Sequence, residues 1–126
     1  MVNDEIIDYV KDNNIEKVKE FVAVGLDVRM INKSLTIASL FGHIELVRLM
    51  LEHGADVNTL DFNDDTPLSF ATMYGYVDVV RLLLEYNPDI NKNRSLLVDP
   101  LRYSCYHRHV EIVKLLVDHG AKFNVR

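Results

Sequence analysis

The chain has 126 residues, of which 48% are hydrophobic and 26% charged, and its formal net charge is −5. This size and composition are typical of one soluble domain with its own core, and the negative balance argues against a nucleic-acid partner, which would want a basic face. The single cysteine, Cys105, excludes a disulfide framework within the chain, so a cytoplasmic location is expected, with the nucleus as the alternative.

The first stretch, MVNDEIIDYVKDNN, carries acidic residues early and has no uninterrupted apolar run. It therefore does not resemble a signal peptide. No stretch of the chain approaches the roughly 18 apolar residues of a membrane span, so no membrane partner is expected.

One segment of the chain recurs at a constant spacing: KSLTIASLFGHIELVRLMLEHGADVN from 33 to 58, TPLSFATMYGYVDVVRLLLEYNPDIN from 66 to 91, and DPLRYSCYHRHVEIVKLLVDHGAKFN from 99 to 124. A slightly shorter shift aligns a fourth copy at the N-terminus, where Gly25-Leu26-Asp27-Val28 matches Gly54-Ala55-Asp56-Val57. The sequence therefore predicts four repeats, at about 1–29, 30–58, 59–91 and 92–124, with residues 29–33 as a shortened loop between the first two.

Each unit reads as two short helices. Thr66-Pro67 and Asp99-Pro100 place a side-chain acceptor at the N-cap and a proline at the first helical position. Lys33-Ser34 stands there in the second unit and predicts a weaker cap. The first helix is expected to end near Gly42, Gly75 or Arg108, in a left-handed turn. Two short helices cannot bury their apolar faces alone, whereas stacked pairs bury each other.

The motifs TPLSFAT and GHIELVRLMLEHGADVN resemble the ankyrin repeat, with its Thr-Pro-Leu-His-x-Ala opening and its Gly-His and Gly-Ala-Asp-Val-Asn signatures. Departures are Thr36, Ser69 and Arg102 in place of the histidine, and Arg108 in place of a glycine. The resemblance implies an all-α solenoid of stacked antiparallel helix pairs with short extended loops, in which residues 1–126 form a single ankyrin-repeat domain.

The first repeat differs from the others in three positions. Asp8, Lys17 and Glu20 replace residues that are apolar in the later repeats and that should face the preceding repeat. This predicts a capping repeat, with Leu49, Leu82 and Leu115 interior at the position of Glu20. The last repeat stays apolar, so its outer face is expected to be bare, covered by a partner, or continued by further repeats.

The sequence shows no chemistry of a catalytic kind. It contains no Gly-rich phosphate loop, no metal-spaced cysteine pair and no nucleophile elbow, so no enzyme activity, cofactor or metal is expected. His43 and His109 hold a position that in the resembling family braces neighbouring loops. His107 and His109 would diverge at a helix end rather than chelate a metal.

The resemblance implies that a partner protein binds a concave face made of loop tips and the exposed ends of the first helices. Aromatic side chains at those ends either pack on the loops behind them or form a binding strip. The expected contact residues are Leu40, Phe41, Phe62, Asn63, Asp65, Met73, Tyr74, Tyr86, Leu96, Val98, Tyr106 and His107.

These observations favour a protein–protein interaction module, monomeric in solution. The alternative is a structural stacking or self-association unit that uses the uncapped C-terminal face, or a fragment of a longer repeat array.

Overall fold

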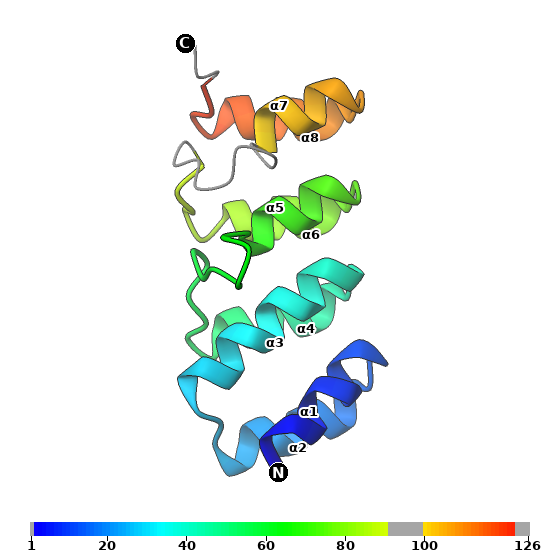
Figure 1. The fold of residues 1–126 in the computed structure, drawn as a ribbon, viewed down its shortest axis with the longest axis vertical. Helices are drawn as coiled ribbons and strands as arrows, with labels where there is room; N and C mark the ends of the chain where they lie inside the picture. The colour runs from blue at the N-terminus through cyan, green and yellow to red at the C-terminus, as the bar shows by residue number, and fades with distance from the viewer. Residues whose placement is uncertain (1, 91–99, 123–126) are drawn as a thin grey trace.

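The computed structural model describes residues 2–90 and 100–122, with side chains from Glu5 onward. The described part of the chain contains helices and no strand (Figure 1). The helices are α1 (Val2–Lys11), α2 (Ile15–Val24), α3 (Val28–Phe41), α4 (Ile44–Glu52), α5 (Pro67–Met73), α6 (Val77–Leu84), α7 (Pro100–Tyr106) and α8 (Val110–Asp118).

Consecutive helices form antiparallel pairs, and the pairs stack in chain order from α1–α2 to α7–α8 (Figure 1). The first helices α1, α3, α5 and α7 contact one another in sequence, as do the second helices α2, α4, α6 and α8. The turns within the pairs follow one edge of the stack, and the connections from α2 to α3 and from α4 to α5 follow the other (Figure 1). The predicted all-α solenoid is therefore confirmed.

The turns within the pairs have the left-handed backbone that the sequence predicts. Gly42 and Gly75 have φ angles of 73° and 74°, and Arg108 and Asn13, which hold the same place in the last and first pairs, have 60° and 56°. The prediction at Arg108 is thus confirmed, although an L-residue in this region costs roughly 1–2 kcal/mol. The cap of α5 also forms as predicted, because Thr66 Oγ1 accepts a hydrogen bond from the Ser69 N–H at 3.1 Å.

The loop predicted for residues 29–33 is wrong, because these residues belong to α3. Asp27 is the N-cap, and its carboxylate accepts from the Arg29 N–H at 2.8 Å. No glycine or proline interrupts residues 28–41, and Ile31 is buried. The weak cap expected at Lys33-Ser34 is therefore not needed, since α3 has already begun at Val28.

The capping prediction is confirmed in part. Lys17 and Glu20 are exposed and form an ion pair at 3.8 Å, whereas Leu82 is buried. Leu49 and Leu115 are only half-buried, which corrects the expectation that both are interior. For Leu49 the reason is visible: it borders an open hollow of about 500 Å³ beside Ile15 and Lys19.

Candidate protein-binding face

A hollow of about 540 Å³ opens between α3, α5 and the connection that precedes α5. We call it the inner hollow, because it lies on the side of the first helices. Most of its exposed lining is apolar. The lining residues are Arg29, Asn32, Lys33, Thr36, Ile37, Leu40, Thr59, Leu60, Asp61, Phe62 and Phe70.

The loop beside the inner hollow is held by one aspartate. Asp61 Oδ1 accepts from the Asn63 N–H at 2.9 Å and from the Asp65 N–H at 3.0 Å. The Asp61 N–H in turn donates to the Asp65 carbonyl at 3.0 Å, and Asp64 takes a φ of 62°. This closed turn leaves the ring of Phe62 fully exposed at the tip. A large apolar side chain presented on a fixed loop is typical of a contact residue.

The opposite wall of the inner hollow is the exposed side of α3. Arg29, Lys33 and Ile37 follow one another at one-turn spacing, so they lie along one side of the helix. Leu40 lies in the next turn. The wall is therefore basic near the start of α3 and apolar toward its end. Arg29 and Lys33 were not predicted as contact residues because they were expected to lie in a loop, although Asp27 and the absence of glycine or proline gave the signal.

The structure separates the predicted contact residues into two groups. Leu40 and Phe62 line the inner hollow. Phe41, Tyr74 and Tyr106 stand at the C-terminal ends of α3, α5 and α7, with 44%, 55% and 83% of each residue exposed. We call these three residues the aromatic row.

The aromatic row is only loosely supported by its own turns. The Phe41 ring stacks on His43 with 5.9 Å between centroids, and the Tyr74 ring centroid lies 6.0 Å from that of Tyr76. These contacts are those expected if the rings pack on the turns behind them, yet a large part of each residue is left in solvent. Both interpretations of the row thus have a structural basis.

The remaining predicted residues are dispersed. Asn63 and Tyr86 are exposed, and Met73 is half-buried. His107 is exposed but its ring stacks on Tyr103, with centroids 4.1 Å apart. Leu96 and Val98 lie outside the described residues.

Asp65 is buried rather than presented at the loop tip. Its Oδ1 atom has no hydrogen-bond partner among the described residues. Burial raises the pKa of the Asp65 carboxyl, and the neighbouring carboxylates of Asp61 and Asp64 raise it further. Asp65 therefore shapes the loop from inside instead of offering a contact.

Residues 6–94 match the family model described as ankyrin repeats in three copies, and residues 99–126 match the model of a further ankyrin repeat. The chain belongs to the ankyrin repeat family. Members of this family generally act as protein–protein interaction modules. Among curated proteins, the chain is similar to the mouse inactive serine/threonine-protein kinase TEX14, with 31% identity over 68 residues. The similarity covers 51% of this chain, and the chain spans about 5% of the length of that relative.

His43 and His109 of this ankyrin chain brace neighbouring repeats as expected. His43 Nε2 lies 3.0 Å from the Lys11 carbonyl of the preceding pair. A Cβ placed on Gly75 would lie 3.0 Å from the ring of His109, so the ring rests against that turn.

Within residues 2–90 and 100–122, no group of three or more histidine, cysteine or acidic residues is placed to hold a metal ion. Nor is any helix in the same ranges long and apolar enough to cross a membrane.

Proposed function

We propose that this ankyrin-repeat chain binds a segment of another protein on its inner face, without catalysis or a cofactor. The observation that carries the proposal is the inner hollow, with its apolar lining and the fully exposed Phe62 at its edge. A concave surface in which apolar side chains surround a few polar groups is the usual form of a binding site. The net charge of −5 and the aspartates of the loop support a protein rather than a nucleic-acid partner.

The aromatic row supports the same proposal from a second position. Its rings lie at the C-terminal ends of the first helices, and the α3 wall of the inner hollow also belongs to a first helix. Aromatic residues are enriched among the few interface residues that dominate binding energy. A partner segment that runs along the first helices would contact the inner hollow at one end and Tyr74 at the other.

The test begins with a displayed library of protein fragments selected against the purified chain. Recovered fragments are then titrated against Phe62→Ala and against Val24→Ala, a control that also removes an exposed apolar side chain, from the end of α2. We expect Phe62→Ala to weaken binding by about 30-fold, equivalent to about 2 kcal/mol, and Val24→Ala to leave it unchanged.

The same titration separates the two groups of contact residues. If Tyr74→Ala weakens binding as much as Phe62→Ala, the partner spans both. If every recovered fragment binds Phe62→Ala and Tyr74→Ala as tightly as the unaltered chain, the inner face is not the binding surface.

A further inference from the structure

The fourth helix pair exposes positions that are buried in the third. Val80 and Leu84 of α6 are buried, with 0% and 1% of each residue exposed. Their counterparts in the next repeat are more open: Val113 is half-buried, and 51% of Val117 is exposed. Thr72 of α5 is fully buried, whereas Cys105, in the same place on α7, is exposed. We call this surface the fourth-pair face. In the third repeat, side chains at the same places are buried inside the stack.

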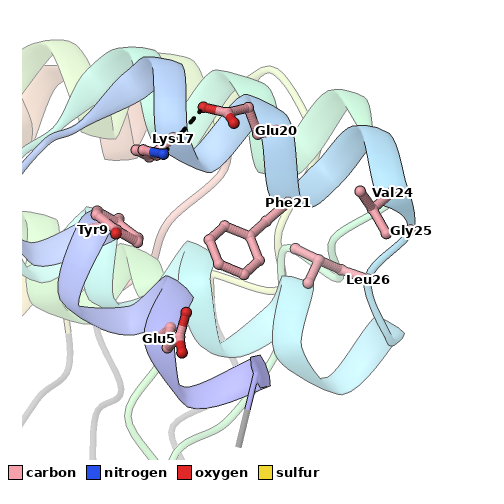
Figure 2. Close-up of a pocket in the computed structure, with 8 residues that line it drawn as sticks. All are labelled: Glu5, Tyr9, Lys17, Glu20, Phe21, Val24, Gly25 and Leu26. Carbon is pink, nitrogen blue, oxygen red and sulfur yellow. Dashed lines mark ion pairs between the residues drawn. The ribbon is translucent and has the colours of Figure 1, made fainter.

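The outer side of the first helix pair holds a complementary hollow of about 310 Å³ (Figure 2). We call it the first-pair hollow. The ring centroids of Tyr9 and Phe21 lie 5.9 Å apart between α1 and α2, beside Leu26. All three residues are half-buried. Tyr9 and Phe21 occupy the places of Ala71 and Leu83, which are fully buried in the third repeat. An apolar floor is therefore open where an interior repeat would be covered.

The ion pair between the third and fourth repeats defines a register for contact between repeats. Arg81 of α6 lies 3.7 Å from Glu111 of α8. In the repeat alignment, Lys114 holds the place of Arg81 and Glu16 holds the place of Glu111. Lys114 and Glu16 are both exposed. A second copy stacked in the same register would set Lys114 of one chain opposite Glu16 of the next, with opposite charges.

We propose that the chain associates with copies of itself head to tail, with the fourth-pair face of one copy seated in the first-pair hollow of the next. Val113 and Val117 would meet the apolar floor around Phe21, and Lys114 would pair with Glu16. This inference is independent of the inner hollow, because the two surfaces that meet lie on the first and fourth helix pairs. The contact is heterologous, because two different surfaces meet. Each copy therefore leaves one surface of each kind for the next copy, and the assembly grows by addition at its ends.

The charged rim of the first-pair hollow limits the strength of this contact. Lys17 and Glu20 hold the places of Val79 and Leu82 in the third repeat. A stacked copy would partly desolvate these two charged side chains, which costs free energy. Their mutual ion pair on the rim, visible in Figure 2, reduces that cost. We therefore expect association that appears with rising protein concentration rather than a permanent dimer.

The first test is sedimentation equilibrium from about 10 μM to about 1 mM, the range in which weak association appears. Reducing buffer prevents disulfides through Cys105. The weight-average mass should rise with concentration from the 14.5 kDa of the single chain, without levelling off at a dimer. Val117→Asp should hold the chain at the monomer mass, with an unchanged circular dichroism spectrum to show that it is folded. A mass that stays at 14.5 kDa throughout this range overturns the proposal.

Charge reversal tests the register. Lys114→Glu and Glu16→Lys should each weaken association by about tenfold, because each sets like charges opposite one another. Mixing the two variants should restore it, because the mixed contacts pair opposite charges again. Arg48→Glu makes the same charge change at the corresponding place on α4 of the second repeat, outside both end surfaces, and should leave association unchanged. Association that Lys114→Glu leaves unchanged, or that the mixture does not restore, refutes the head-to-tail register.

A zero-length carbodiimide cross-link gives a direct readout. It joins an amine to a carboxylate only when the two are in contact. Peptide mapping of the cross-linked dimer should find Lys114 joined to Glu16, and the product should disappear in Lys114→Gln. Cross-links that join other residues in its place would show that copies meet by a different surface.

Discussion

Replacing Arg108 by glycine should make the protein more stable, although it removes a whole side chain. Arg108 has a φ of 60°, in the turn between α7 and α8. The corresponding residues of the second and third pairs are glycines, with φ angles of 73° and 74°. A residue with a Cβ pays roughly 1–2 kcal/mol for this conformation, and glycine adopts it without that penalty.

The expected gain is smaller than the full strain, because glycine also has more freedom in the unfolded chain. That entropy costs about 0.5–1 kcal/mol. The backbone hydrogen bonds of the turn, from the Arg108 N–H to the Cys105 carbonyl at 3.2 Å and from the Val110 N–H to the Arg108 carbonyl at 2.9 Å, do not depend on the side chain. The Arg108 side chain is exposed, so little packing is lost. We expect a net gain of about 0.5–1 kcal/mol in the free energy of unfolding.

The measurement is a urea titration at a few micromolar protein, where self-association is negligible. With a slope of about 1–2 kcal/mol/M, the midpoint should rise by about 0.5 M. Gly75→Ala is the matched control. The alanine would have to keep the φ of 74° that Gly75 adopts, and its Cβ would lie 3.0 Å from the His109 ring. It should lower the midpoint. A less stable Arg108→Gly variant would show that the arginine side chain contributes more than the turn costs.

Three further predictions concern the core, the loop and the aromatic row. Leu82→Ala should cost roughly 2–5 kcal/mol of stability and the exposed Glu20→Ala less than about 0.5 kcal/mol in the same urea titration, and equal losses would contradict the capping prediction. Asp65→Asn should stabilise the protein at pH 7. Folding raises the pKa of Asp65 above its usual value of 3.8, so the native state holds the carboxyl proton more tightly than the unfolded chain. Stability therefore falls as the pH rises from 3.8 through the raised pKa, and an asparagine, which carries no charge, avoids that loss. The gain, read from melting temperatures between pH 3 and pH 7, should vanish near pH 3, and a constant gain would refute the electrostatic cause. Phe41→Ala combined with Tyr74→Ala should abolish binding of a selected fragment with little change in melting temperature, and unfolding of the double variant would show that the rings belong to the core.

The parts of the fold that follow from local rules could be predicted from the sequence. The constant spacing of the repeats, the Thr66-Pro67 cap and the glycine turns each determine backbone conformation locally. Even the strained turn at Arg108 could be predicted, because its position in the repeat requires it. The start of α3 also follows from a local rule, because Asp27 caps the helix at Val28. The expectation of a loop at residues 29–33 came from alignment with the longer repeats, in which the first helix begins later.

The inner hollow was harder to predict because it depends on distant segments. Its walls combine α3 with a loop of the following repeat. Ile37 and Phe70 also line it, although they hold the place of Asp8 in the later repeats, a position expected to face the preceding repeat. The burial of Asp65 was hidden in the same way. An aspartate in a polar loop suggests exposure, but the hydrogen bonds of Asp61 close the turn and draw Asp65 inward. Sequence periodicity cannot report such a turn, because only one of the described connections between repeats contains it.

The inner face and the ends of the stack are separate surfaces, and this separation has a consequence for affinity. Because α1, α3, α5 and α7 follow one another along one side, copies stacked head to tail would place their inner hollows in a row on that side (Figure 1). A partner with two binding segments could then occupy hollows on adjacent copies, and its second contact would form at an effective concentration set by the linker. Binding of such a partner should strengthen when the protein concentration is raised into the range where copies associate. Lys114→Glu should remove that gain and leave the affinity of a single segment unchanged, because Lys114 lies on α8, away from the inner hollow.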